Sequence, residues 1–293
     1  MLAALAFSAM ERHPSSFADP VEPRRWRSIW ISDVHLGTRH AQVASLLDFL
    51  RLTESDYLYL VGDLVDGWEL KRSWRWEPGY NTLIQKLLRK QRKGTEVFYL
   101  AGNHDEFLEP FVGLQFGGVR VAREVVHQAA DGRRYLVVHG HQFDGLTRFN
   151  RLLEKLGSAL YNWVLDANLW ANRLRRRLGL GYWSFAGYLK AKAKKSVQYI
   201  TEYEVAMIRL AESHQVDGII CGHIHRAEIR TIGALCYLNC GDWVESCTAL
   251  VEDYSGTMRL VQYHESAVHG TGRGSGTSDP SSVGLPELVT TGT

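Results

Sequence analysis

The stretch that decides the fold runs over nine residues and reads Ile29-Trp30-Ile31-Ser32-Asp33-Val34-His35-Leu36-Gly37. An apolar run of the kind that forms a buried strand ends in a carboxylate and an imidazole two residues apart, and a glycine follows. A strand that delivers two such donors at its C-terminal end is typical of a metal site. One D-x-H pair arises often by chance, so its weight depends on whether the pattern is repeated along the chain.

The same pattern recurs four times. Asp56 to Asp63 ends in G-D, Glu96 to Asp105 ends in G-N-H-D, Tyr135 to His141 ends in H-G-H, and Asp217 to His225 ends in G-H-x-H. Each run is an apolar strand followed by polar donors, with a glycine that lets the backbone approach closely. Because such strand ends meet at one edge of a sheet, we expect all five to converge on a single cleft.

Helical patterns separate the first strands, at Ala41 to Arg51 and at Asn81 to Lys93, so strand and helix alternate as in an α/β protein. The chain then finishes in three strand-like runs. They are Leu235 to Val244, Cys247 to Tyr254 and Thr257 to Tyr263.

The donors at the strand ends are three carboxylate or amide groups and four imidazoles. These are Asp33, His35, Asp63, Asn103, His139, His223 and His225. The set is too large for one four-coordinate zinc and suits two ions with five or six ligands each. Asp63, alone at the end of a central strand, is expected to bridge them. Two ions about 3.5 to 4 Å apart activate water and clamp a phosphoryl group, so the predicted reaction is hydrolysis at phosphorus.

Length and composition favour one catalytic domain with additions. The 293 residues are 45% hydrophobic and 23% charged, enough for one large core. We predict a loose leader over residues 1–25, a catalytic domain over 26–265 with a helical lid inserted at about 145–213, and a disordered tail rich in Gly, Ser and Thr over 266–293. The helical candidates in the insertion are Thr147 to Leu156, Ser158 to about Leu178 and Trp183 to Ser213.

The charge is unevenly distributed. Residues 145–200 hold eleven Lys and Arg against two acidic residues, and the whole chain has a net charge of +2, so the insertion is basic and the remainder acidic.

The four cysteines lack a C-x-x-C spacing and are expected to be reduced and buried, which favours a cytoplasmic address. Met1 to Met10 has neither the basic start of a signal peptide nor the length of a membrane span.

The aromatic segment with Trp68, Trp74 and Trp76 is expected to cover the core rather than the active site.

The ordered motifs D-x-H, G-D-x-x-D, G-N-H-D, H-G-H and G-H-x-H resemble the calcineurin-like metallophosphoesterase superfamily from Arg27 to Tyr263. The resemblance implies a four-layer sandwich of two mixed sheets flanked by helices. It implies one ion on Asp33, His35, Asp63 and His225, and a second on Asp63, Asn103, His139 and His223. It also implies that His104 donates to a phosphoryl oxygen or the leaving group, and that Asp66 orients His104.

Within the superfamily, the chain resembles the UDP-2,3-diacylglucosamine diphosphatases of lipid A synthesis. The resemblance rests on the first strand end, on the basic helical insertion with its run Tyr188 to Lys195, and on the ending Cys221 to His225. It implies cleavage of a nucleotide-linked glycolipid to UMP and a diacyl sugar phosphate, manganese as the metal, and peripheral attachment to the inner membrane surface. Lys190, Lys194 and Lys195 would then bind substrate phosphate, with Asn103 beside them in the substrate site. A basic surface that faces the membrane is an equally good interpretation of the lid, and both roles stay open.

Other functions remain as alternatives. The diphosphatases carry Arg where this chain has His104, so a related pyrophosphatase or phosphodiesterase with another substrate stays open. A scaffold without catalysis is disfavoured because all seven ligand positions are filled. Nucleic acid is not an expected partner, since the basic cluster Arg173 to Arg177 lacks interleaved aromatic residues.

Overall fold

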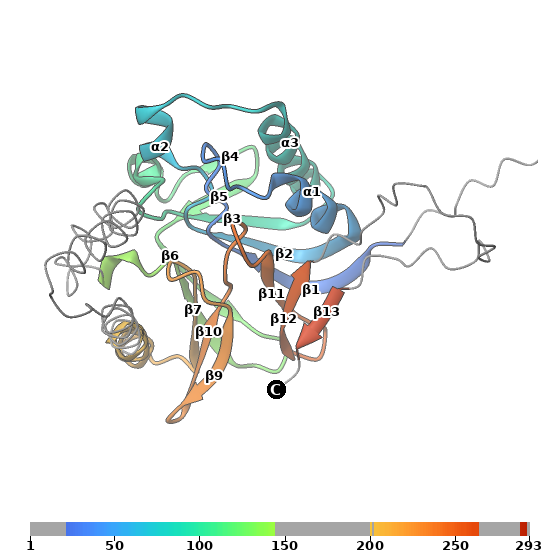
Figure 1. Cartoon of the computed structure of the whole chain (residues 1–293). Coiled ribbons are helices and arrows are strands. Elements are labelled where there is room, and N and C mark those ends of the chain that lie inside the picture. Colours follow the sequence, from blue (N-terminus) through green and yellow to red (C-terminus); the bar gives the residue numbers. More distant parts are fainter. Residues whose placement is uncertain (1–21, 144–199, 201, 264–287, 292–293) are drawn as a thin grey trace, which may run out of the picture.

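The computed structural model describes residues 22–143, 200, 202–263 and 288–291 (Figure 1). Most of the predicted lid therefore lies outside the described residues, as do Lys190, Lys194 and Lys195. The first 21 residues of the predicted leader and residues 266–287 of the predicted tail lie outside them too.

The larger sheet has eight strands in the order β13-β12-β11-β1-β2-β3-β5-β4. Their bounds are β1 Arg24–Ile31, β2 Thr53–Val61, β3 Glu96–Leu100, β4 Gln115–Phe116, β5 Val119–Ala122, β11 Thr248–Glu252, β12 Met258–Tyr263 and β13 Leu288–Thr291. Strands β1, β2, β3 and β5 run parallel, and the outer strands are antiparallel to their neighbours. The sheet is therefore mixed.

The smaller sheet has five strands in the order β6-β7-β8-β10-β9. Their bounds are β6 Glu124–Gln128, β7 Arg134–Val138, β8 Gly218–Cys221, β9 Glu228–Ile232 and β10 Leu235–Asn239. Strands β7, β8 and β10 are parallel, with an antiparallel strand at each edge. This sheet is mixed as well.

The helices lie outside the two sheets (Figure 1). They are α1 Val43–Leu52, α2 Gly67–Arg72, α3 Pro78–Arg92, the 3₁₀ helix η1 Glu106–Phe111 and a helix over residues 202–213. Helices α1 and α3 correspond to the two predicted from the sequence. The helix over 202–213 is the described end of the last helix predicted in the insertion. No helix in the described part of the chain is long and apolar enough to span a bilayer.

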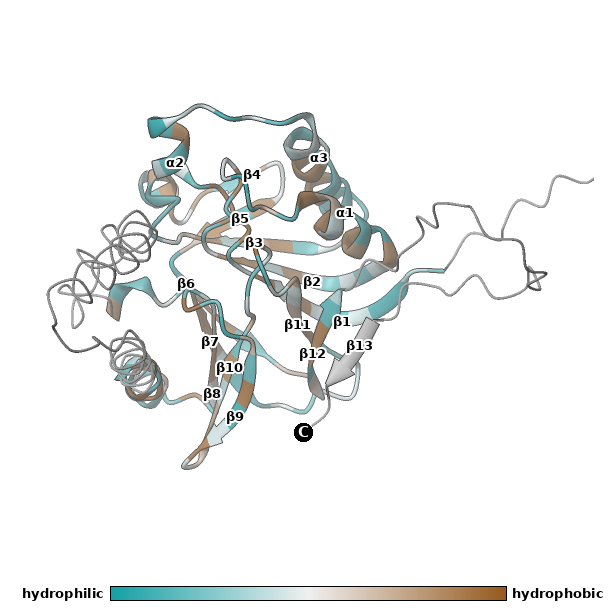
Figure 2. Ribbon diagram, in the orientation of Figure 1, coloured by the Kyte–Doolittle hydropathy of each residue, from teal (hydrophilic) through white to brown (hydrophobic). Residues whose placement is uncertain are grey.

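Alternating side chains of the central strands separate the layers. Ile29 and Ile31 of β1 pack in the cluster that includes the apolar faces of α1 and α3, whereas Trp30 packs with residues of the smaller sheet. On the other sheet, Leu136 faces the helix over 202–213 and Val137 packs toward the larger sheet. Successive strand residues point to opposite faces, so each sheet is covered on both sides. Figure 2 shows hydrophobic residues on the strands of both sheets. The predicted four-layer sandwich is confirmed.

The ends of the chain differ in detail from the sequence prediction. Strand β1 begins at Arg24, inside the predicted leader, and pairs with Thr53 of β2. Within the predicted disordered tail, Leu288–Thr291 form β13, which pairs with β12. The low apolar content of the whole tail concealed this short segment, whose residues Val289, Thr290 and Thr291 are β-branched and favour a strand.

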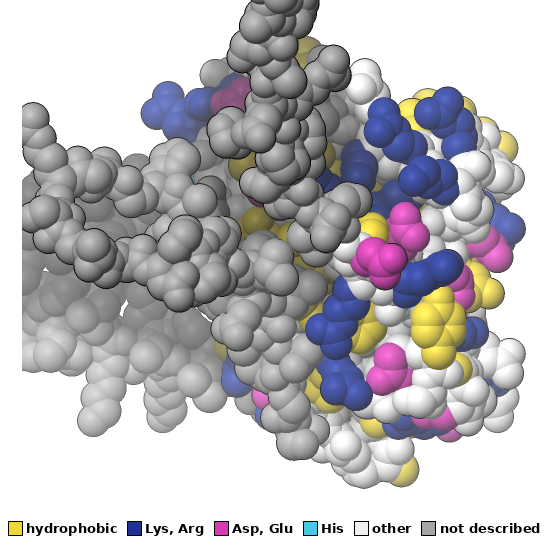
Figure 3. Space-filling model, turned by 90° about the vertical axis from the view of Figure 1, so that its right-hand side faces the viewer, with side chains coloured by type: hydrophobic (Ala, Val, Ile, Leu, Met, Phe, Trp, Pro, Cys, Tyr) yellow, Lys and Arg dark blue, Asp and Glu magenta, His cyan; other side chains and the backbone are white. Residues whose placement is uncertain are grey.

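The acidic balance of the chain outside the insertion does not make its surface uniformly acidic. Figure 3 shows one face of the molecule on which lysine and arginine side chains gather, with acidic side chains between them.

Candidate metal centre

The donors predicted from the sequence follow five strands that end at the same edge of the sandwich. Strand β1 leads to Asp33 and His35, β2 to Asp63, β3 to Asn103, β7 to His139, and β8 to His223 and His225. Three groups of donor atoms within 4.8 Å of one another result. They are Asp33 with His35 and His225, His35 with Asp63 and His104, and Asp63 with His139 and His223. The five strand ends thus converge on one site.

The backbone at this edge is strained. Asp33, His35 and Asp63 have φ angles of 53°, 52° and 53°, and His223 and His225 have 68° and 53°. This left-handed region costs a non-glycine residue roughly 1 to 3 kcal/mol and tends to be kept where function requires it. Among the described residues, only Gln215 and Cys247 are further non-glycine residues with positive φ. Backbone strain is therefore concentrated at the predicted ligands.

Asp33 anchors the first group. Its Oδ2 accepts a hydrogen bond from the backbone N–H of His223 at 2.8 Å. Its Oδ1 lies 3.3 Å from Nε2 of His225 and 3.7 Å from Nε2 of His35. One carboxylate oxygen is thus held by the backbone, and the other faces two imidazole nitrogens.

Asp63 repeats this arrangement and joins the two halves of the site. Its Oδ1 accepts from the backbone N–H of His104 at 2.9 Å. Its Oδ2 lies 3.8 Å from Nε2 of His35 and 3.3 Å from Nε2 of His139. A single oxygen faces histidines of both groups, which is the position a bridging carboxylate needs.

Two of the histidines are oriented through their second nitrogen. Nδ1 of His139 donates to the carbonyl oxygen of Val61 at 2.8 Å, and Nδ1 of His35 lies 3.1 Å from Oδ2 of Asp66. A partner on Nδ1 fixes the ring and leaves Nε2 as the nitrogen for a metal.

Several buried atoms at this edge lack a hydrogen-bond partner among the described residues. Among them are Oδ1 of Asp33, Nε2 of His35, Oδ1 of Asn103 and Nε2 of His139. Buried polar atoms are normally hydrogen-bonded, and one without a partner costs free energy. All four belong to predicted ligands, so the donor set fits divalent cations bound between them.

The electrostatics of the site reflect closely packed carboxylates and imidazoles. Burial disfavours the charged form of His35, but the neighbouring carboxylates of Asp33 and Asp66 outweigh it and raise the pKa of His35 to about 10. Burial likewise opposes protonation of His139, yet the negative charge of Asp63 raises the pKa of His139 to about 9. Burial would raise the pKa of Asp63, but His139 lowers it to about 2. The carboxylates are therefore anionic, and without metal the two imidazoles carry protons.

His104 belongs to the second of these donor groups, and Asp66 lies beside it. Nδ1 of His104 is 2.9 Å from Oδ2 of Asp66, and its ring centroid is 4.6 Å from that of His35. Asp66 also caps α2 by accepting from the backbone N–H of Glu69 at 2.8 Å. Burial would raise the pKa of Asp66, but the hydrogen bonds to His104 and His35 lower it well below its usual range.

The expectation for Trp68 was wrong. Its ring centroid lies 4.2 Å from that of His104, with 38° between the two ring planes. This tryptophan therefore belongs to the site and does not merely cover the hydrophobic core. A signal was present in the sequence, because Trp68 is only two residues after Asp66. Trp76, by contrast, packs against the core cluster as expected.

Asp105 is a position next to the donor groups that the site prediction did not include. It is fully buried and accepts from the backbone N–H groups of Gly102 and Leu64 and from the hydroxyl of Tyr99, at 2.5, 3.0 and 2.7 Å. Burial and the nearby charge of Asp63 raise the pKa of Asp105 to about 6. Its contacts tie the turn after β2 to the turn after β3. The final aspartate of the G-N-H-D motif was the feature of the sequence that could have indicated this residue.

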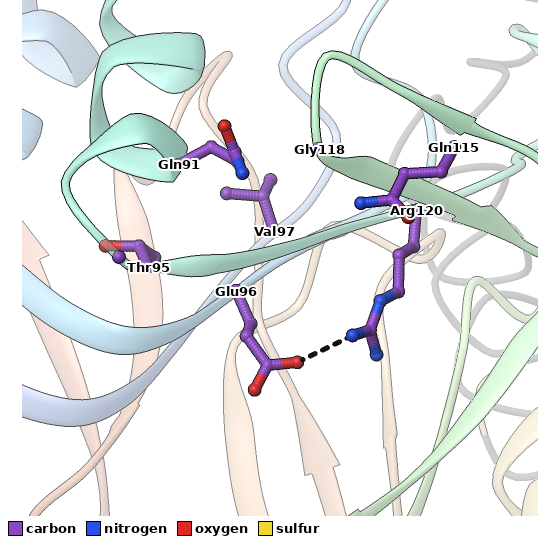
Figure 4. A pocket seen from close by; sticks show the side chains of 8 residues that line it. Gln91, Thr95, Glu96, Val97, Gln115, Gly118 and Arg120 are labelled. Atoms are coloured by element: carbon purple, nitrogen blue, oxygen red, sulfur yellow. Dashed lines mark ion pairs between the residues drawn. The ribbon is translucent and has the colours of Figure 1, made fainter.

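Two cavities in the described part of the chain lie away from this edge. One of about 140 Å³ is lined by residues at the start of β3, where Glu96 and Arg120 form an ion pair at 3.2 Å (Figure 4). The other, of about 560 Å³, lies between the sheets beside Arg27 and His127. Arg27, Glu96 and His127 belong to the parts of β1, β3 and β6 remote from the ligand turns. Neither cavity includes a predicted site residue.

Comparison with known protein families identifies the chain. The model of the family described as calcineurin-like phosphoesterase matches residues 27–227. The chain belongs to the calcineurin-like phosphoesterase family. Members are metal-dependent phosphoester hydrolases that generally bind two divalent metals, and the donor groups described above provide candidate sites for them.

Curated relatives of this calcineurin-like phosphoesterase include two named UDP-2,3-diacylglucosamine hydrolase. The one from Psychromonas ingrahamii is 28% identical over 208 residues, which are 68% of this chain and 81% of the relative. The one from Serratia proteamaculans is 27% identical over 220 residues, 70% of this chain and 84% of the relative.

Solved structures with a similar arrangement are more distant in sequence. Vps29 of Chaetomium thermophilum is 10% identical with a TM-score of 0.42, and the match covers 82% of this chain and 88% of that one. Vps29 of Entamoeba histolytica, in complex with zinc, is 14% identical with a TM-score of 0.41, over 80% of this chain and 91% of that one.

Proposed function

We propose that this phosphoesterase hydrolyses the pyrophosphate of UDP-2,3-diacylglucosamine to UMP and 2,3-diacylglucosamine 1-phosphate, with two manganese ions. The observation that carries the chemistry is the position of Asp63, whose Oδ2 faces His35 and His139 at 3.8 and 3.3 Å. The substrate is taken from the names of the curated relatives, which match about 70% of the chain.

Each ion has its own set of residues in this proposal. Asp33, His35, Asp63 and His225 would hold one, and Asp63, Asn103, His139 and His223 the other. When bound, such ions activate water and neutralise the charge that develops on the phosphoryl oxygens. Oxygen donors together with imidazoles are compatible with manganese.

His104 supplies or orients a proton at the phosphoryl group. Asp66 occupies its Nδ1 at 2.9 Å, so Nε2 is the nitrogen left for a substrate oxygen. Hydrolysis forms a bond from the water oxygen to phosphorus and breaks the bond to the bridging oxygen, which leaves with the second phosphate. A donor at this position lowers the barrier by stabilising that departing oxygen.

The basic lid would bind the remainder of the substrate and the membrane. Lys190, Lys194 and Lys195 are proposed to contact substrate phosphate, and the surplus of positive charge in residues 145–200 favours an anionic leaflet. The protein would then be cytoplasmic and peripheral to the inner membrane.

A second function within the same reaction class has a specific observation behind it. His104, where the diphosphatases carry arginine, is packed by Trp68 at 4.2 Å between ring centroids, and Asp66 occupies its Nδ1, so one ring nitrogen is left for substrate. Such a group suits a smaller phosphodiester or another nucleotide pyrophosphate, because it offers fewer hydrogen-bond donors to a second phosphate than the fork of a guanidinium does.

The test is direct. The purified protein is incubated with manganese and UDP-2,3-diacylglucosamine in detergent, and the products are separated by mass. Release of UMP and the diacylglucosamine 1-phosphate supports the proposal. Fast cleavage of bis(p-nitrophenyl) phosphate without release of UMP would keep the two-metal chemistry and replace the substrate with that of the second candidate.

A further inference from the structure

The loop between α2 and α3 carries an exposed tryptophan that the catalytic site does not use. Trp74 is 77% exposed, and the other exposed large hydrophobic residues of the described chain are at most 53% exposed. Exposing an indole to water is unfavourable, since a tryptophan offers a large apolar area. A single exposed apolar residue is common, so the surroundings of Trp74 decide whether it has a role.

The indole of Trp74 is held in place by a row of rings. It stacks on Trp76 with centroids 6.2 Å apart and planes 20° apart. Trp76 packs edge-on against Tyr80 at 5.4 Å, and its Nε1 donates to Oδ1 of Asn81 at 2.9 Å. Tyr80 is 2% exposed and belongs to the core cluster. Trp74 is therefore presented outward by a support that continues into the core, so little conformational entropy remains to be lost on binding.

The last turn of α2 and the loop that follows it carry basic residues. The run Lys71-Arg72-Ser73-Trp74-Arg75-Trp76 interleaves cations with aromatic rings. Arg72 pairs with Glu69 and Arg75 with Glu77, and Lys71 has no ion pair among the described residues. Three cations and two carboxylates leave one net positive charge. The loop thus combines an amphipathic ring with a weakly basic surface.

The loop begins one short helix away from the catalytic edge. Helix α2 begins directly after Asp66, which contacts His104, and its six residues span about 9 Å at 1.5 Å per residue. The segment after α2 then runs across the top of the molecule to α3 in Figure 1. A surface that contacts Trp74 would therefore lie close to the metal centre.

From these observations we infer that residues 71–76 are an interfacial anchor, in which Trp74 enters the headgroup layer of a lipid bilayer and Lys71 contacts anionic headgroups. Tryptophan prefers this layer because its ring is apolar and its N–H can hydrogen-bond there. The inference deepens the proposed function, because an enzyme with a lipid-linked substrate has to bind that substrate at a membrane. The biological role of the anchor rests on the proposed function, whereas membrane binding itself does not.

The inference predicts binding of the full-length protein to vesicles of phosphatidylcholine with about 30% phosphatidylglycerol. Replacing Trp74→Ala is expected to weaken co-sedimentation by about tenfold or more, because the buried ring area is lost. Trp74→Phe should retain most of the binding. The matched control is Tyr254→Ala, which removes an aromatic ring that is 53% exposed and follows β11 at the opposite end of the strands.

The depth to which Trp74 enters the bilayer gives an independent test. The chain has nine tryptophans, so the signal of Trp74 is the fluorescence difference between the natural protein and Trp74→Phe. Acyl chains brominated near the headgroup should quench that difference. Absence of quenching together with equal sedimentation of the natural protein and Trp74→Ala would overturn the inference, as would a natural protein that does not bind vesicles. Binding of a single-stranded oligonucleotide that depends on Trp74, without vesicle binding, would replace the membrane with nucleic acid.

The test separates this inference from the catalytic proposal. Trp74→Ala should hydrolyse bis(p-nitrophenyl) phosphate at the natural rate, because Trp74 belongs to none of the donor groups and its ring stacks on Trp76. Failure to cleave UDP-2,3-diacylglucosamine would leave the vesicle result unchanged. Loss of vesicle binding with retained diester hydrolysis is the outcome that supports the anchor.

Discussion

Nδ1 of His104 lies 2.9 Å from Oδ2 of Asp66. The same oxygen lies 3.1 Å from Nδ1 of His35, so one carboxylate orients both the proposed proton donor and a proposed metal ligand. Asp66→Asn should lower kcat by about 10- to 100-fold, because the amide keeps the shape and the helix cap while losing the charge. Turnover of bis(p-nitrophenyl) phosphate and metal content measure the effect.

The control for this variant is Asp48→Asn, which neutralises a carboxylate of α1 that pairs with Arg51 on the surface. It should leave turnover unchanged. If Asp66→Asn also retains natural turnover, the pairing with His104 has no catalytic role.

The shared oxygen of Asp63 leads to the strongest prediction. Asp63→Ala should abolish turnover, because it removes the group that faces His35 and His139 together. Metal analysis should find fewer than two ions per chain. Asp56→Ala, at the other end of the same strand, serves as control. Normal activity of the Asp63 variant would end the two-metal proposal.

His104 is expected to act after the metals are in place. His104→Ala should leave the metal content at the natural level and slow the phosphoryl step by about 100-fold or more, since a proton donor is lost without a ligand being lost. The exposed His40 provides the control, as His40→Ala. Loss of metal in the His104 variant would instead make this residue a ligand, in agreement with its place near His35 and Asp63.

The proposed substrate role of the lid lysines can be separated from catalysis by comparing two substrates. Lys190→Ala combined with Lys194→Ala should raise KM for UDP-2,3-diacylglucosamine more than KM for bis(p-nitrophenyl) phosphate, because only the lipid substrate offers a second phosphate to bind. The paired variant Arg24→Ala with Arg25→Ala, at the start of β1, tests the effect of lost charge alone. Equal changes for both substrates would contradict recognition of the lipid substrate by the lysines.

The convergence of the ligands was predicted from the periodicity of the strands, and the four layers from the resemblance to the metallophosphoesterase superfamily. Alternation along β1 requires Ile31 and Trp30 to face different layers, and the C-terminal ends of parallel strands meet at one edge. The motifs then named the residues at that edge. Neither step needs knowledge of distances.

The sequence could not predict features that depend on contacts between distant turns. Residue order does not say which oxygen of Asp33 accepts from the backbone of His223, or that Trp68 packs on His104. Strand β13 was missed because its partner, β12, is remote from it in sequence, and pairing depends on the folded sheet. The left-handed backbone at Asp33 and Asp63 is also a tertiary effect, since local propensity disfavours it.

The protonated histidines of the metal-free site predict how metal binding depends on pH. His35 and His139 have pKa values raised to about 10 and about 9, so both carry protons at pH 7, and an imidazole must lose its proton to bind a metal. Binding should therefore release about two protons, and manganese affinity should rise by about 100-fold per pH unit below pH 9. The rise should weaken above pH 9, when His139 is already neutral, and end above pH 10.

Calorimetric titration of the metal-free protein in two buffers of different ionisation enthalpy measures the number of protons released. His35→Gln should reduce it by about one, because one of the two raised groups is gone. His40→Gln, outside the site, should not change it. An affinity that does not depend on pH between 7 and 9, with no proton release, would mean that the metal does not bind at the imidazoles of His35 and His139, and would direct the search for the ligands elsewhere in the chain.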